Sequence, residues 1–93
     1  MVVGLCTVEL LISESQSLKD KRRVLHSLKD RLHGKFNVSV AEVEGQDLWQ
    51  KAVVGMVCVA NESKHVNQVL EQALNLIKST PTVEVVRTHL ELL

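Results

Sequence analysis

Aromatic side chains are almost missing from this 93-residue sequence, which has one Phe, one Trp and no Tyr. Domains that read single-stranded RNA commonly stack its bases on aromatic side chains of a β-sheet. The two most apolar segments, residues 2–12 and 50–60, contain no aromatic residue at all. The composition therefore nearly excludes this base-stacking mode of RNA recognition.

The motifs of common enzymes are also missing. The four glycines are scattered at positions 4, 34, 45 and 55, so there is no GxGxxG, Walker or GxSxG motif to bind phosphate or present a nucleophile. The polar loop at residues 13–17 has neither the glycine and arginine of an acylphosphatase cradle nor the Cys pair of a copper chaperone. We therefore expect a protein that is not an enzyme and that needs no cofactor.

Cysteine is scarce, and its placement points to a reducing compartment. Cys6 and Cys58 lie far apart in apolar segments and form no CxxC motif, which favours reduced, buried thiols. The four histidines are dispersed and lack zinc-ligand spacing, so no metal site is expected. The apolar residues at the start carry Glu9 and are too short to span a bilayer. We expect a cytoplasmic protein with no membrane partner.

Hydrophobic periodicity predicts six elements within one domain, residues 1–93. Apolar or alternating segments predict strands, and apolar residues at helical spacing predict helices. The strands are expected at residues 2–12, 36–44, 50–60 and 83–92, with helices at 18–33 and 62–78. Ser17 is expected to cap the first helix with Asp20 in its first turn, and Gly34 to end it. Asn61 is expected to cap the second helix.

The resulting order, β-α-β-β-α-β, is that of the ferredoxin-like fold. Right-handed crossovers would place both helices on one face of a four-stranded antiparallel sheet with strand order 4-1-3-2. The first and third strands would then be central, which agrees with their being the most apolar segments. The fold class predicted from the sequence is therefore α+β and ferredoxin-like.

The sheet face without helices is predicted to be apolar. Val3, Leu5 and Leu11 would lie on it, and a monomer seldom exposes a contiguous apolar patch. We therefore expect this face to be buried against a second copy in a homodimer. The alternative is a face that is apolar only at its centre and is rimmed by charged side chains of the first and last strands.

Positive charge is concentrated in the first helix, although the whole chain is neutral. Seven of the eleven Lys and Arg residues lie between positions 19 and 35, against only two acidic residues, which leaves five net positive charges. The flank expected to be exposed consists of Lys19, Arg22, Arg23, His26, Lys29 and His33. Such a cluster can neutralise the phosphates of RNA. The alternative is an ordinary solvated helix face, since Lys and Arg are good helix formers.

Trp49 follows the turn-forming sequence at residues 45–47. Trp is enriched where proteins bind partners, so Trp49 is a candidate partner-binding residue. The alternative is that its ring closes the hairpin or packs over a helix end.

Three strings give the chain a resemblance to a known family: VVGLCTVELLI, SQSLKDKRRVLHSLKDRL and FNVSVAEVEGQDLWQKAVVGMVCVAN. Together they resemble the YlxP-like family of small bacterial proteins over nearly the whole chain. The resemblance implies a ferredoxin-like fold and a bacterial cytosolic setting. Members are often encoded near genes of translation and ribosome maturation, which implies RNA or ribosomal particles as partners and no catalytic residue.

The function expected from the sequence is therefore non-enzymatic RNA or ribosome binding through the first helix. The alternative is a regulatory or scaffolding dimer that binds a small molecule or a protein through its sheet face.

Overall fold

The computed structural model describes residues 1–93 and has six elements in the order β-α-β-β-α-β. These are β1 (Val2–Leu11), α1 (Leu18–Lys35), β2 (Ser39–Glu44), β3 (Lys51–Ala60), α2 (Ser63–Lys78) and β4 (Glu84–Leu92). The order and type of all six elements agree with those predicted from periodicity. No helix is long and apolar enough to cross a membrane.

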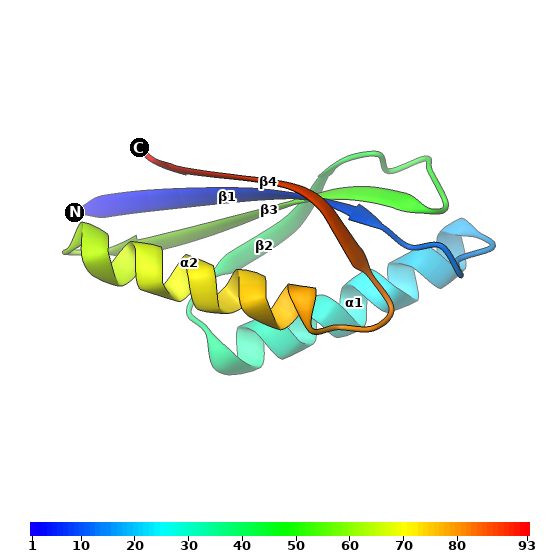
Figure 1. Cartoon of the computed structure of the whole chain (residues 1–93), viewed down its shortest axis with the longest axis horizontal. Coiled ribbons are helices and arrows are strands. Elements are labelled where there is room, and N and C mark those ends of the chain that lie inside the picture. Colours follow the sequence, from blue (N-terminus) through cyan, green and yellow to red (C-terminus); the bar gives the residue numbers. More distant parts are fainter.

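The four strands form one antiparallel sheet in the order β2-β3-β1-β4. The predicted strand order is confirmed, since it is the same order read from the opposite edge. The central strands β1 and β3 each have ten residues and pair along their whole length. Figure 1 shows both helices on the same side of the sheet, so the other face is open.

Alternation along the strands places the core between the sheet and the helices. In β1, Cys6, Val8 and Leu10 are buried, while the residues between them are only half-buried. α2 presents Val66 and Leu70 to the same layer, and both are fully buried. The apolar face of an amphipathic helix thus covers one face of the sheet, as the sequence pattern requires.

The start of α1 is fixed by side-chain hydrogen bonds. The backbone N–H of Asp20 donates to Oγ of Ser17 at 3.0 Å, and the N–H of Gln16 donates to Oδ2 of Asp20 at 3.1 Å. These bonds satisfy amide groups that would otherwise lack a partner at the helix start. The predicted role of Ser17 as N-cap is confirmed.

Two other predicted caps are wrong. Gly34 lies inside α1, which continues to Lys35 and ends at an extended Phe36 whose N–H donates to the carbonyl of Leu32. The helix therefore needs no left-handed glycine to stop. Asn61 does not cap α2, because β3 runs to Ala60 and the helix begins only at Ser63, with Glu62 in the capping position.

The buried thiols predict a loss of stability at alkaline pH. Burial raises the pKa of Cys6 above its ordinary 9.0, partly opposed by the Lys78 ammonium, and burial also raises the pKa of Cys58. A raised pKa in the folded state means that the unfolded chain releases these protons first. The stability that depends on keeping these thiols protonated is fully present below pH 9. It is lost as the pH rises through the folded-state pKa values of the thiols.

Urea unfolding followed by circular dichroism between neutral pH and about pH 10.5 checks this expectation. The Cys6→Ala/Cys58→Ala variant should show a shallower alkaline decline than the natural chain. Equal declines in the two proteins would contradict the assignment to the thiols.

Candidate nucleic-acid interface

Two adjacent stripes of side chains run along α1 at alternating spacings of three and four residues. The inner stripe holds Leu18, Lys21, Leu25, Leu28 and Leu32, of which all but Leu18 are buried. The stripe one position further on, here called the basic stripe, holds Lys19, Arg22, His26, Lys29 and His33. All of its members are exposed except Lys29, which is half-buried. Side chains at these spacings are neighbours on a helix, so the basic stripe is continuous.

A cavity of about 220 Å³ lies beside the middle of the basic stripe. Arg22, His26 and Lys29 line it from α1. Its apolar lining consists of Leu25, Leu28, Val40 and Val54, and Glu42 of β2 completes it. The structure therefore brings three of the six predicted basic residues to one hollow between the helix and the β2 edge of the sheet.

Most cations of this flank have no acidic partner. No carboxylate lies within 4.0 Å of the charged groups of Lys19, Arg22, Arg23 or Lys29. The one ion-pair contact on the flank joins Nε2 of His26 to Oδ2 of Asp30 at 3.4 Å, and both side chains are largely exposed. The flank therefore carries a positive field that is available to an outside anion.

Arg23 does not belong to the basic stripe. One residue advances a helix by about 100°, which turns Arg23 away from Arg22. It lies instead beside Asp20 and Val24 at a separate hollow that Thr82 also lines. Arg23 is nevertheless exposed and lies four residues after Lys19 and three before His26, so it remains on the predicted exposed flank, at its outer margin.

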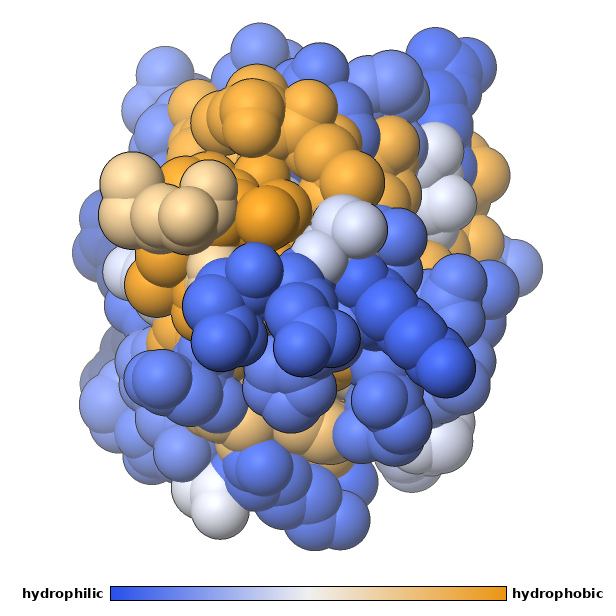
Figure 2. Space-filling model, turned by 90° about the vertical axis from the view of Figure 1, so that its left-hand side faces the viewer, coloured by the Kyte–Doolittle hydropathy of each residue, from blue (hydrophilic) through white to orange (hydrophobic).

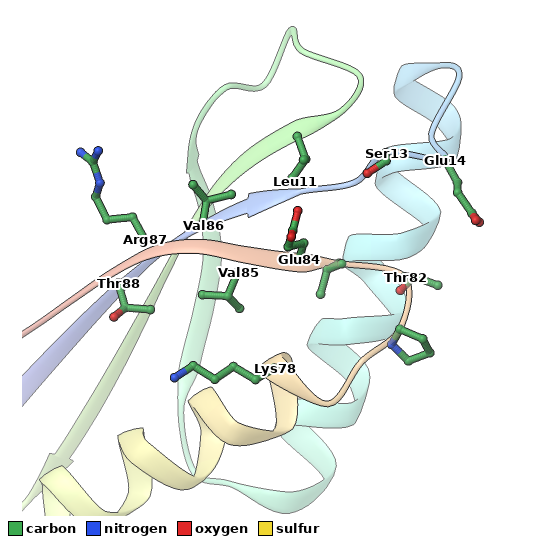
Figure 3. Close-up of a pocket in the computed structure, with 12 residues that line it drawn as sticks. Leu11, Ser13, Glu14, Lys78, Thr82, Glu84, Val85, Val86, Arg87 and Thr88 are labelled. Carbon is green, nitrogen blue, oxygen red and sulfur yellow. The ribbon is translucent and has the colours of Figure 1, made fainter.

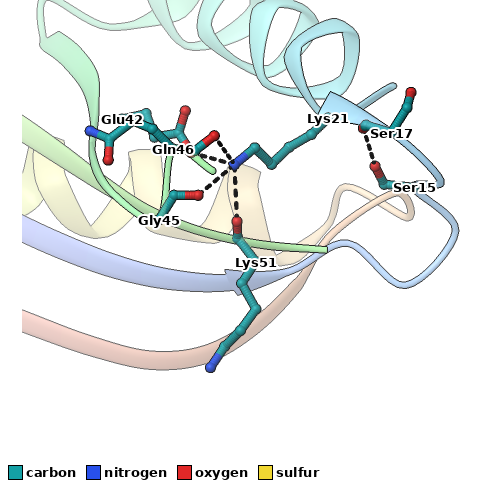
Figure 4. A network of polar contacts seen from close by, with 7 residues as sticks. All are labelled: Ser15, Ser17, Lys21, Glu42, Gly45, Gln46 and Lys51. Carbon is teal, nitrogen blue, oxygen red and sulfur yellow. Dashed lines mark hydrogen bonds and ion pairs between the residues drawn. The ribbon is translucent and has the colours of Figure 1, made fainter. Parts of the chain in front are cut away.

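Lys21 contributes to the positive charge of the segment, but it is not an exposed cation. It is 1% exposed, and its Nζ lies 2.8 Å from Oε2 of Glu42 (Figure 4). The same ammonium donates to the backbone carbonyls of Gly45 at 2.7 Å, Lys51 at 3.3 Å and Gln46 at 3.4 Å. Burial of the charge is possible because the carboxylate and the carbonyls replace its hydration.

A signal for this buried lysine was present in the sequence. Lys21 occupies the inner stripe, three residues after Leu18 and four before Leu25. Glu42 is placed on the inner face of β2 by alternation with Val40. A cation and an anion on two inward-facing stripes can only be accommodated as a pair, and this reasoning would have found them.

Lys21 also holds the β2–β3 hairpin that carries Trp49. The hairpin turns at Gly45, whose φ of 80° is the only positive value in the chain. Trp49 is 56% exposed and Leu48 is 50% exposed, and both line a shallow hollow next to Leu11. The single Trp of the chain is thus largely accessible at the surface.

The open face of the sheet is apolar over its central strands. Val3, Leu5 and Leu11 are half-buried on it, and Val57 and Val59 of β3 are 38% and 51% exposed. Figure 2 shows an apolar surface at the end of the molecule that carries the two termini, above a polar lower half. Toward β4 the same face becomes charged, because the register places Arg87, His89 and Glu91 there. The face therefore has an apolar part and a charged margin.

The largest hollow, about 690 Å³, is open and runs along the margin of β4 (Figure 3). Val85 points toward the helices, whereas Val86 and Arg87 point to the other side of the sheet. Lys78 lies on the helix side, so its ammonium and the Arg87 guanidinium do not converge. This hollow is the flank of an edge strand rather than a catalytic cleft. No three His, Cys, Asp or Glu residues lie close enough together to hold a metal ion.

Comparison with known families adds one decisive observation. Residues 3–90 match the model of a family described as "Protein of unknown function (DUF503)". The chain belongs to the DUF503 family. It is 34% identical over 90 residues to the "Uncharacterized protein YlxP" of Bacillus subtilis (strain 168), a match that covers 97% of this chain and 98% of that protein. The YlxP-like resemblance read from the sequence is therefore confirmed.

Among solved structures, this DUF503 chain is similar to the "De novo designed protein Foldit4". The TM-score is 0.56 at 14% sequence identity, with 100% of this chain and 97% of that chain covered. At this identity the likeness concerns the fold alone, since unrelated functions share folds.

Proposed function

We propose that this chain is a non-enzymatic RNA-binding protein of the bacterial cytoplasm, with a ferredoxin-like fold, and that α1 contacts the RNA backbone. The observation that supports this function best is the row of cations on α1 without acidic partners, in a chain of zero net charge. The partner would be a structured RNA, free or within a ribosomal particle.

The geometry of the basic stripe suits a phosphate backbone. Lys19 and Lys29 are ten residues apart, which corresponds to about 15 Å along a helix. Lys and Arg side chains on such a row can reach several successive phosphates and release their counterions. Contacts of this type need no aromatic platform, in agreement with the absence of aromatic residues from β1 and β3.

Charge reversal on the basic stripe tests the proposal. For Arg22→Glu/Lys29→Glu, we expect the affinity for a structured ribosomal RNA fragment to fall about tenfold or more. The slope of log affinity against log salt should become shallower by about two, because two phosphate contacts are lost. Fluorescence anisotropy with a labelled RNA at several salt concentrations measures both quantities.

The matched control is Lys64→Glu/Lys78→Glu, which makes the same change in net charge on α2 instead of α1. This control should retain most of the affinity and the original salt slope. RNA affinity that does not change with salt, or equal losses in both double variants, would reject a specific phosphate interface on α1.

A second candidate function is that of a scaffolding or regulatory domain that uses the open sheet face. The exposed Val57 and Val59 favour it, because a partner would remove an apolar surface from water. The simplest partner is a second copy, which would also bury Val3, Leu5 and Leu11. Val57→Asp should then dissociate the dimer without changing RNA affinity.

A further inference from the structure

β4 is a long edge strand with unused pairing capacity. It has nine residues and pairs on one side only, with β1. Every residue of β4 except Val85 is exposed, including Leu90 at 36% and Leu92 at 44%. An exposed edge of this length presents a row of unpaired N–H and C=O groups and invites another strand. A bulge interrupts the strand between Val85 and Arg87, so residues 87–92 are its regular part.

The hydrogen-bond pattern identifies the residues that face outward. The N–H of Leu93 donates to the carbonyl of Val3 at 2.8 Å, so this pair is hydrogen-bonded. Because hydrogen-bonded and non-hydrogen-bonded pairs alternate in an antiparallel ladder, Glu91 and His89 also direct their backbone groups to β1. The backbone groups of Thr88, Leu90 and Leu92 are therefore directed to the free edge.

We propose that β4 pairs antiparallel with β4 of a second copy, with His89 on the two-fold axis. In this register Thr88 lies opposite the partner's Leu90, and both have outward-directed backbone groups, so the two strands can exchange hydrogen bonds. His89 then lies directly opposite the partner's His89, and the two form a non-hydrogen-bonded pair. The two sheets join into one continuous eight-stranded sheet, and the contact is isologous, as expected of a homodimer.

Charge favours this register over the one centred on Thr88. With His89 on the axis, Arg87 lies opposite the partner's Glu91, and the symmetry repeats this pair. A register centred on Thr88 would instead place Arg87 opposite the partner's His89 and leave Glu91 facing an apolar Val85. Opposite charges on directly paired residues stabilise a sheet.

Within the chain, Arg87 forms no ion pair and Glu91 forms only a long one. Arg87 lies opposite Glu9 in the register, yet Glu9 makes its ion pair with Lys51 at 3.8 Å, and Arg87 has no carboxylate within 4.0 Å. Glu91 approaches only Nε2 of His89, at 3.9 Å. Both groups are therefore available to a second copy.

The joined sheet would also leave the open face of each copy accessible.

Cross-linking and charge exchange test the pairing in the full chain. Two residues that face each other as a non-hydrogen-bonded pair have Cα atoms about 4.5 Å apart, within the range of a disulfide. His89→Cys should therefore give a disulfide-linked dimer on mild oxidation, whereas Lys64→Cys on α2 should not. Cys6 and Cys58 are buried and contribute little background.

Sedimentation over a range of micromolar concentrations gives the second readout. Arg87→Glu should raise the dissociation constant of the dimer about tenfold or more, because two attractive pairs become repulsive. The exchange Arg87→Glu/Glu91→Arg should restore it. A natural chain that remains monomeric at high micromolar concentration would overturn the proposal. A dimer that dissociates with Val57→Asp but is indifferent to Arg87→Glu would also overturn it and assign the contact to the open face.

Discussion

The Lys21→Met variant is expected to lose about 3 kcal/mol of the free energy of unfolding. Methionine can fill the space of the lysine stem, but it leaves the Glu42 carboxylate without its cation. It also leaves the carbonyls of Gly45 and Lys51 without the ammonium donor. Because the Glu42 side chain keeps 20% exposure, the loss should lie at the lower end of the range for a broken buried pair.

Thermal unfolding followed by circular dichroism should show a decrease of about 10–20 °C for Lys21→Met. The control Lys19→Met removes an exposed lysine two positions away and should change the stability by less than about 0.5 kcal/mol. Adding Glu42→Leu to Lys21→Met should recover about 1 kcal/mol, because the unpaired carboxylate is then gone. Equal small effects of Lys21→Met and Lys19→Met would contradict a structural role for the buried ammonium.

A second large effect is expected at Gly4, where α2 packs directly against β1. A Cβ atom at this position would overlap Cγ1 of Val66 and would lie 2.8 Å from Cδ1 of Leu70. Both side chains are fully buried and have little room to move. Gly4→Ala should therefore lower the free energy of unfolding by about 1–3 kcal/mol, as other overpacked cores do, and Gly4→Val by more.

The same glycine-to-alanine substitution at Gly34 is the control, and it is expected to raise the free energy of unfolding rather than lower it. Gly34 lies within α1, and an added Cβ would meet no atom within 4 Å. Gly34→Ala should raise the free energy of unfolding by about 0.5–1 kcal/mol, because alanine has the higher helix propensity. Urea unfolding of the two variants in parallel measures both effects. Destabilisation by Gly34→Ala, or none by Gly4→Ala, would contradict the packing seen between α2 and β1.

The sequence contained enough information to predict the elements and their order in the sheet. The two ten-residue apolar segments had to be central, and the helical spacing in α2 matched the burial of Val66 and Leu70. The helix ends were less predictable, because a cap depends on where the chain leaves the preceding strand. Asn61 has a suitable side chain, but it lies too close to the end of β3 to cap α2.

The sequence predicted that the first helix carries positive charge. It did not predict which of those cations are exposed and free of partners in the folded chain. Counting charges in the segment treated Lys21 and Arg31 as equivalent to Lys29. In the structure the Lys21 ammonium is buried and donates hydrogen bonds to carbonyls of the hairpin. Nη1 of Arg31 donates to Oγ1 of Thr80 at 3.1 Å. Only tertiary contacts separate the cations that stabilise the fold from those left for an external anion.

The position of Trp49 makes the intrinsic fluorescence of the protein a probe of the β2–β3 hairpin. The chain has no other Trp and no Tyr, so nearly all of its ultraviolet emission arises from the β2–β3 hairpin. Because this indole is already in contact with water in the folded state, global unfolding should shift its emission maximum little. A molecule that covers the hairpin would shift the maximum to shorter wavelength. Intrinsic fluorescence of this protein therefore reports binding at the hairpin rather than melting of the core.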